Sequence, residues 1–458
     1  TFKKLIFLKT YNILILICTV MRVAMAINWN LDASSLTNIA RHNFREIGKI
    51  MNETKSFTLS AIKIQQVRLG DFNYHFDLLH IPNMGGYRYS LDAGFHCDKI
   101  IIGGSGIDEI IYGKQILAWK GSWPTVKKQI IKELSNWKNY INQIEHVHVP
   151  ANTELDEFHK YLEIPYEKLS VINHGVDHNF FKPSVNKENN RKKLLSKLKI
   201  PNAPYFLHIG ENNFERKNLK RLGKAFEKAK YSKSSSNFQH NLIIAGKHYS
   251  IIENILSKIP DIYFLDWISN DDLLQLIQGA DAFLLPSIHE GFGMPLVESM
   301  ACGIPCVSSN RHAPPEILSD SGLLVDPFDV DDIANAIIKL ANDKKLLQDL
   351  SVKSLARAQD FSWKKNAEEI FKLYGIDSSK PTKNFEKDYE LAGYRTLVSV
   401  ADMIPTPNVN LLDPLLRFDY PSLLDWGVNT ALKNAKTRDF LLPFEDWYKL
   451  KLEENSKQ

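Results

Sequence analysis

The chain has 458 residues, and the 44% that are hydrophobic can fill more than one apolar core, which favours two or three domains. Its 57 basic and 53 acidic residues leave a formal net charge of +4, a mild excess that argues against a nucleic acid partner. The four cysteines lack the paired short spacings of a zinc site and are too few for a disulfide scaffold, so a reducing, cytoplasmic setting fits best.

Residues 1–20 form an apolar leader after a basic start at Lys3 and Lys4. The leader resembles a short signal or anchor, but a membrane span needs about 20 mostly apolar residues, and no small-residue cleavage site follows. Because Met21 stands directly before the strand-like segment Arg22–Asn28, we interpret the leader as the product of a misplaced gene start. A membrane anchor is the alternative.

Residues 21–190 alternate short apolar runs with stretches of helical period, which is the rhythm of strand–helix units. Asp77–Ile81 and Lys99–Ile102 are two of these apolar runs. The polar, lysine-rich segment Lys182–Lys199 predicts a connection between two domains that leads into a helix.

A second series of strand–helix units fills residues 191–360. Its predicted strands are Tyr205–Gly210, Asn241–Gly246, Ile262–Leu265, Ala282–Leu285 and Pro305–Ser308. A return helix within residues 361–376 and an extension over residues 377–458 complete the chain. The sequence therefore predicts an α/β fold with two Rossmann-like, doubly wound domains facing a crevice, where the carboxyl ends of the strands bind ligands.

The most informative segment, Pro286–Pro305, directly follows a predicted strand. Gly291 and Gly293 permit a tight turn with positive φ, and Pro295 has the fixed φ suited to the first turn of a helix. The unpaired N–H groups and the positive dipole end of such a helix suit a diphosphate.

Two glutamates flank this turn. Glu298, expected in the first helical turn, can accept two hydrogen bonds from a vicinal diol such as ribose. Glu290, at the strand end, would face a sugar. Either residue alone could be an ordinary acid of a loop or a helix start, but the pair around one glycine turn predicts a binding site.

A basic pair, Arg216 and Lys217, follows the strand end at Gly210 and opens a predicted helix. Cations at such a turn can neutralise the charge that builds up on a leaving diphosphate. Surface solvation is the ordinary explanation of a basic pair, but its position at a strand-to-helix turn favours a functional role. No Asp-x-Asp motif stands at a suitable strand end, so we predict no metal site and no obligatory metal.

The segment around the two glutamates resembles the Glu-x7-Glu signature of family 4 glycosyltransferases, the glycosyl transferases group 1, which are retaining enzymes of the GT-B fold. The resemblance covers residues 170–374. Its further segments are Asn173–Asp177, Phe181–Pro183, Ala301–Pro305, Pro315–Glu316, Gly322–Pro327 and Asp360–Trp363. It implies a GT-B architecture for the two predicted domains, with residues 377–458 as a C-terminal extension.

The resemblance also implies roles for individual residues. The catalytic set that it implies is Glu290, Lys217, Arg216 and His80. The donor-binding set that it implies is Glu298, Gly291, Phe292, Gly293, Met294, Gly210, Ser34 and Ser35. Two positions depart from the family pattern: serines stand where relatives carry a glycine-rich loop, and Glu211 occupies the place of an arginine, which leaves Arg216 as its substitute.

The activity implied by the resemblance is that of a retaining hexosyltransferase. It would move a hexose-type sugar from a UDP- or GDP-linked donor to a hydroxyl acceptor in glycan or glycolipid synthesis. The nucleotide diphosphate-sugar is a substrate, and no cofactor is obligatory. The alternatives are a sugar phosphorylase or a sugar-phosphate synthase of the same fold, and a GT-B scaffold without catalysis.

The acceptor and the cellular setting are predicted from one further segment. Trp123–Lys138 is basic and has apolar residues at helical spacing. Since lipid-modifying members of the family touch membranes, the resemblance implies a glycan or lipid-linked acceptor, and it makes a peripheral contact with the inner face of the cytoplasmic membrane one interpretation of this segment. An ordinary amphipathic helix packed on the first sheet is the other interpretation, and the segment slightly favours it. The sequence predicts no oligomeric state.

Overall fold

The computed structural model describes most of the chain from residue 21 to residue 379. The described residues are 21–26, 35–62, 76–82, 97–104, 107, 111–112, 128, 144–210, 215–232, 238–246, 250–266, 268–379 and 385. The leader, nearly all of the Trp123–Lys138 segment and most of the C-terminal extension lie outside them. By its internal contacts the chain divides into two compact units, one made of residues 1–104, 139–148 and 367–458 and the other of residues 105–138 and 149–366.

The first sheet has six strands, in the order β2-β1-β3-β4-β5-β6. They are β1 (Met21–Ala26), β2 (Phe57–Ile62), β3 (Phe76–Ile81), β4 (Cys97–Gly103), β5 (Ile144–Val149) and the short β6 (Leu169–Val171). Strand β1 pairs in parallel with β2 and β3, and β4 pairs in parallel with β3 and β5. The three strands predicted in this half of the chain are therefore confirmed.

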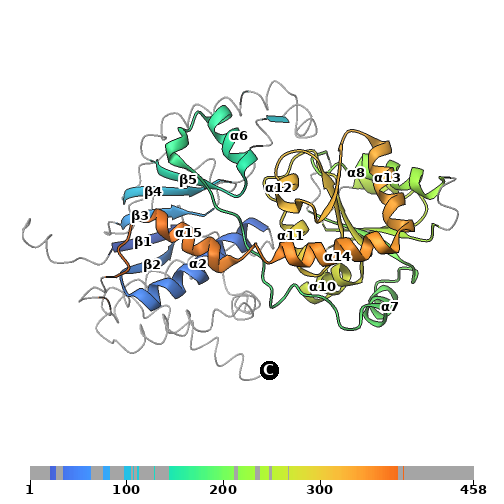
Figure 1. The fold of residues 1–458 in the computed structure, drawn as a ribbon, viewed down its shortest axis with the longest axis horizontal. Coiled ribbons are helices and arrows are strands. Elements are labelled where there is room, and N and C mark those ends of the chain that lie inside the picture. The colour runs from blue at the N-terminus through green and yellow to red at the C-terminus, as the bar shows by residue number, and fades with distance from the viewer. Residues whose placement is uncertain are drawn as a thin grey trace, which may run out of the picture. The chain divides into compact units, whose positions relative to one another are not determined.

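Two helices of the first unit lie beside its sheet. They are α2 (Ser35–Thr54) and the end of α15 (Trp363–Leu373), which Figure 1 shows beside strands β1 to β3. The rings of Phe57 on β2 and Phe371 on α15 lie 5.2 Å apart between centroids. Aromatic burial of this kind fixes the end of the chain's last described helix on the first sheet.

The second sheet also has six strands, all parallel, in the order β12-β11-β10-β7-β8-β9. They are β7 (Tyr205–Ile209), β8 (Asn241–Ala245), β9 (Ile262–Leu265), β10 (Ala282–Leu285), β11 (Cys306–Ser309) and β12 (Gly322–Val325). The five strands predicted here are confirmed, and so is the α/β class. Their sequences are nearly continuous apolar runs because helices cover both faces of a parallel sheet.

Most helices of the second unit divide into two layers around this sheet. They are α7 (Lys187–Lys197), α8 (Leu219–Lys230), α9 (Ser250–Leu256), α10 (Asn270–Gly279), α11 (Met294–Ala301), α12 (Pro314–Leu318), α13 (Val330–Asn342) and α14 (Lys344–Ala358). Helix α6 (Asn152–Leu162) instead contacts strand β6 of the first sheet. Along β7, Tyr205 and Leu207 face the core cluster shared with α7, α10 and α11, whereas Phe206 faces the cluster shared with α8, α9 and α13. This period of two separates the layers, and Figure 1 shows α8 and α13 side by side in one of them.

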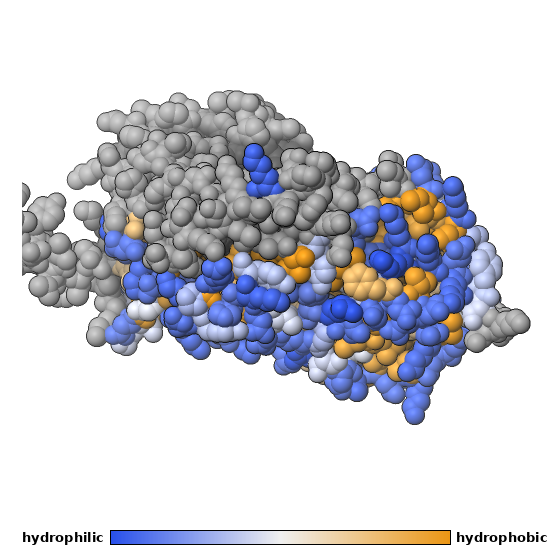
Figure 2. Space-filling model, turned by 90° about the horizontal axis from the view of Figure 1, so that it is seen from above, coloured by the Kyte–Doolittle hydropathy of each residue, from blue (hydrophilic) through white to orange (hydrophobic). Residues whose placement is uncertain are grey.

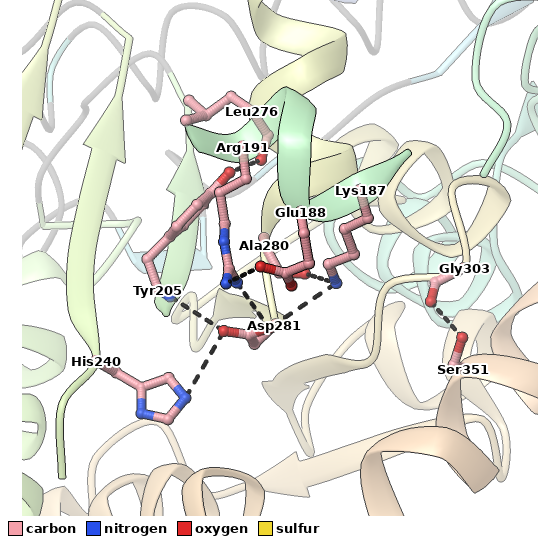
Figure 3. Close-up of polar contacts among 10 residues, drawn as sticks. All are labelled: Lys187, Glu188, Arg191, Tyr205, His240, Leu276, Ala280, Asp281, Gly303 and Ser351. Carbon is pink, nitrogen blue, oxygen red and sulfur yellow. Dashed lines mark hydrogen bonds and ion pairs between the residues drawn. The ribbon is translucent and has the colours of Figure 1, made fainter. Parts of the chain in front are cut away.

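A partly buried carboxylate attaches α7 to the second sheet (Figure 3). Asp281, just before β10, accepts a hydrogen bond from the Tyr205 backbone at 3.1 Å and lies 3.5 Å from Arg191 and 3.9 Å from Lys187. These partners come from α7 and β7, so one side chain connects helix α7 to a strand in the middle of the second sheet. The segment Lys182–Lys199, which we expected to be a connection leading into a helix, itself contains α7.

The described surface is polar overall. Figure 2 shows one face on which hydrophobic residues form separate patches among hydrophilic ones. Scattered exposed hydrophobic residues are normal for a folded domain. None of the helices within the described ranges is both long and apolar enough to cross a bilayer.

Candidate active site

The glycine turn and helix predicted after β10 are present. Helix α11 begins at Met294, Pro295 lies in its first turn, and Gly293 precedes it with φ of +90°. A left-handed φ of this kind favours glycine because other residues are strained there. The prediction of a positive φ at Gly291 is wrong, since Gly291 is not among the glycines with positive φ.

A side chain at position 291 would instead crowd a neighbouring side chain. A Cβ atom added there would lie 2.2 Å from Oε1 of Glu154, a fully buried residue in the first turn of α6. The turn therefore packs against a buried carboxylate that the sequence analysis did not single out. No local pattern could have indicated this contact, because the two residues are far apart in the chain.

Glu290 lies between two cations. Its Oε1 is 2.7 Å from Nζ of Lys217, and its Oε2 is 3.2 Å from Arg216. Lys217 is only 5% exposed and Glu290 only 6%. Burial alone would raise the pKa of Glu290, but the charges of Lys217 and Arg216 outweigh it and lower the pKa to about 2. The three side chains therefore form a cluster with a net charge of +1, in which Lys217 and Glu290 are buried and Arg216 is partly exposed.

Backbone hydrogen bonds hold this cluster together. The backbone N–H of Ile288 donates to the carbonyl of Arg216 at 2.8 Å, and the Arg216 guanidinium donates to the carbonyl of His289 at 3.2 Å. Asn218, with φ of +59°, donates from Nδ2 to the carbonyls of Pro286 and Pro327. Asparagine tolerates the left-handed conformation, so Asn218 is a positioning residue whose function the sequence analysis missed.

Gly210 makes room for Lys217. A Cβ atom at Gly210 would lie 3.1 Å from Cε of Lys217. A larger residue at the end of β7 would thus press on the lysine that pairs with Glu290. Glu211, the position where relatives carry an arginine, lies outside the described residues.

Glu298 is the fifth residue of α11, so the expectation that it lies in the first turn is wrong by a small margin. Its side chain is partly buried, and its carboxylate accepts no hydrogen bond from any described residue. Burial raises the pKa of Glu298 to about 7. The predicted contact of Glu298 with a ribose diol stays a prediction.

Phe292 and Met294 are fixed by their own packing. The Phe292 ring lies 5.0 Å from the ring of the buried His174 and 5.6 Å from that of Phe361, and Met294 packs on the same core cluster. Their side chains therefore anchor the turn, and the donor-binding role that the resemblance implies for both residues stays a prediction.

The candidates from the first half of the chain are described within their own unit. His80, on β3, is fully buried; its Nδ1 lies 2.9 Å from the Tyr374 hydroxyl and its Nε2 lies 3.1 Å from Nε2 of His148. Burial lowers the pKa of His80 to about 3, so the ring is neutral. These contacts favour a structural role, and the catalytic role of His80 stays a prediction. Ser35 begins α2, and Ser34 lies outside the described residues.

Comparisons with known proteins bear on the same part of the chain. Residues 186–356, which carry Arg216, Lys217, Glu290 and Glu298, match the family model described as glycosyl transferases group 1.

Two curated relatives illustrate the similarity. An O-antigen chain mannosyltransferase B of Escherichia coli is 30% identical over 190 residues, which are 40% of this chain and 49% of that protein. An MMP alpha-(1->4)-mannosyltransferase of Mycolicibacterium hassiacum is 25% identical over 339 residues, which are 70% of this chain and 75% of that protein. The match thus spans about half the length of the first relative.

Solved structures share the fold. A sucrose-phosphate synthase from Thermosynechococcus elongatus aligns with a TM-score of 0.61 at 16% sequence identity, over 77% of this chain and 98% of that one. The two parallel sheets, the Lys217–Glu290 cluster at the start of α11 and the matched family model agree on one assignment. Residues 186–356 thus match the glycosyl transferases group 1, and the two sheets have the α/β architecture of the GT-B fold.

Proposed function

We propose that the chain is a glycosyltransferase that moves a hexosyl unit from a nucleoside diphosphate-sugar to a hydroxyl group, with retention of configuration. The observation that carries this proposal is the cluster of Lys217, Arg216 and Glu290 beside the start of α11. A net positive, largely buried cluster next to the N–H groups of a helix start suits a diphosphate leaving group.

In this proposal each residue has a part in one displacement. The bond from the anomeric carbon to the diphosphate breaks, the acceptor oxygen bonds to that carbon on the same face, and the hydroxyl proton passes to the departing diphosphate. Lys217 and Arg216 stabilise the negative charge that grows on the diphosphate. Glu290 orients both cations and contacts the sugar, and Glu298 accepts hydrogen bonds from the ribose.

The donor sugar to test first is mannose, because both curated relatives described above are named mannosyltransferases. An acceptor among glycans or lipid-linked glycans fits the O-antigen chain in the name of the first of them. Contact with a membrane surface stays a prediction, since of the Trp123–Lys138 segment only Lys128 lies within the described residues.

A thermal-shift screen of the full chain tests the proposal. GDP, UDP and ADP, their mannose and glucose derivatives, and inorganic phosphate are added separately. A ligand at about 100 times its Kd stabilises the folded state by about 2.7 kcal/mol, so one nucleotide series is expected to raise the unfolding midpoint by several degrees. No shift with any nucleotide, or a shift with inorganic phosphate alone, would contradict the proposal and favour a phosphorylase or an inactive scaffold.

Glu298→Gln is expected to separate binding from stability. The variant loses a charged acceptor for the ribose, so nucleotide affinity falls by about 1–3 kcal/mol, roughly 5- to 150-fold. Without nucleotide it should be more stable than the parent at neutral pH. The folded-state pKa of about 7 lies above the ordinary 4.5, so ionising Glu298 costs the folded state stability as pH rises from about 4.5 to 7.

Urea unfolding at pH 4 and pH 8, with and without nucleotide, checks both parts of this prediction. A gain of about 1–3 kcal/mol is expected at pH 8 and none at pH 4. Glu227→Gln, an exposed glutamate on α8, is the matched control and should change neither quantity. Unchanged nucleotide affinity in folded Glu298→Gln would remove Glu298 from the site.

A further inference from the structure

A second cluster of titratable side chains includes His289, the residue before Glu290. Glu157 of α6 places Oε2 3.0 Å from Nε2 of His289 and Oε1 2.7 Å from Nδ1 of His312. One ligand atom from each of the three residues lies within 4.8 Å of the other two. The cluster joins an acid to two imidazoles that lie 132 and 155 residues away in the sequence.

We propose that Glu157, His289 and His312 form a binding site for a divalent transition-metal cation, with zinc as the expected occupant. Two imidazole nitrogens and one carboxylate are a ligand set that zinc uses, and they leave a fourth position for water. This site is separate from the proposed diphosphate site and does not depend on the proposed function.

The distances suit a closed, metal-free form of such a site. In a tetrahedral zinc site, ligand bonds of about 2.0–2.2 Å place neighbouring donor atoms about 3.3–3.5 Å apart. The pairs at 2.7 and 3.0 Å need to separate by only about half an ångström to accept the ion. The side chains of Glu157 and His312 keep 12% and 14% of their surface exposed, so the ion has a path to the site.

The surroundings also fit coordination. The second ring nitrogen of His312, Nε2, lies 2.8 Å from the hydroxyl of Tyr112. Metal-binding histidines usually donate their other N–H group to such a partner, which fixes the tautomer and the orientation of the ring. His312 also holds a left-handed φ of +60°, an uncommon conformation that aims its side chain at Glu157.

A metal here would brace the turn that carries Glu290. His289 is the neighbour of Glu290, and its carbonyl accepts the hydrogen bond of Arg216. The residue after His312, Ala313, donates its backbone N–H to the carbonyl of Glu290 at 3.3 Å. The ion would therefore connect α6 to both loops that position Glu290.

Metal binding by the untagged full chain tests the proposal. Protein stripped with a chelator is dialysed against zinc, and bound metal is measured by mass spectrometry; cobalt(II) is used in parallel for its visible absorption bands. One zinc per chain and the bands of four-coordinate cobalt are expected. A chain that retains no stoichiometric zinc after dialysis would overturn the proposal.

Three variants and a control locate the ion. Glu157→Gln and His312→Asn should each weaken zinc binding more than about 100-fold, and Tyr112→Phe about 10-fold, since it removes only the outer partner. Asparagine tolerates the left-handed φ of residue 312, so His312→Asn should fold. This variant still tests the site in the case that Glu157→Gln does not fold. His159→Asn is the control, because His159 lies on α6 like Glu157 but its ring contacts the Ile164 carbonyl. Zinc retained at parental affinity by folded His312→Asn would contradict the site, because two carboxylate hydrogen bonds then explain the cluster.

Discussion

Lys217→Met is expected to lower the free energy of unfolding by about 3 kcal/mol at neutral pH and, under the proposed function, to lower kcat by about 10²- to 10³-fold. Methionine keeps the apolar stem of the lysine but removes its charge. Glu290 then stays buried with Arg216 as its remaining cation at 3.2 Å. Removing one partner of a buried ion pair is costly because the other charge is left desolvated.

The loss of stability should depend on pH in a defined direction. In the parent, the pKa of Glu290 is lowered from the ordinary 4.5 to about 2. The stabilisation from this group is therefore complete above pH 4.5 and is lost as pH falls toward 2. In Lys217→Met the pKa of Glu290 rises, so the two proteins should differ most above about pH 5 and converge in acid.

Urea unfolding at pH 7 and pH 3, together with steady-state kinetics on the donor identified by thermal shift, measures both effects. Lys220→Met is the control, because Lys220 is an exposed residue of α8 that pairs with Glu215. A variant of Lys217 whose KM for the donor rises while kcat stays unchanged would make Lys217 a ground-state phosphate contact. Equal stability of parent and variant at pH 7 would contradict the buried ion pair itself.

The parts of the fold that the sequence predicted are those with strong local signals. The strands of the second sheet are apolar runs bounded by turns, and the Gly293–Pro295 turn contains the residue types that a strand-to-helix turn needs. Each of these signals lies within about ten residues, so no tertiary contact was needed to predict it. The family resemblance placed Lys217 and Glu290 in one catalytic set, but their pairing was not expected.

The parts that were missed depend on contacts between distant residues. His80 lies in a strand buried along nearly its whole length, and its partner Tyr374 is 294 residues away. Nothing near His80 in the sequence indicates whether its ring faces a ligand or the core. Glu157 and His312 have the same problem, since each is unremarkable alone and only the packing of α6 against two loops brings them together. Side-chain chemistry predicts what a residue can do, but tertiary packing decides which residues it meets.

Two segments of the family resemblance turn out to be one structural junction. Val176 forms a parallel bridge with Ser362, and its backbone N–H donates to the carbonyl of Phe361 at 3.3 Å. The side chain of Asn366 donates to the carbonyl of Asn173 at 2.7 Å. Backbone therefore contacts backbone between the segments Asn173–Asp177 and Asp360–Trp363. This contact gives a physical reason why both segments belong to the family resemblance.

Gly175→Ala is expected to disrupt this junction and to destabilise the second unit by about 3 kcal/mol or more. A Cβ atom at Gly175 would lie 2.1 Å from the backbone nitrogen of Trp363 and 2.5 Å from the carbonyl carbon of Ser362. No flexible side chain can move aside there, so the two backbone segments must separate and lose the Val176–Ser362 bridge. The unfolding midpoint should fall by about 6 °C or more, as measured by thermal unfolding followed by circular dichroism.

The control is Gly375→Ala, since a Cβ atom at Gly375 meets nothing within 4 Å and only its φ of +66° opposes the change. That control should cost about 1 kcal/mol, and a Gly175→Ala variant no less stable than the control would show that the junction yields without loss.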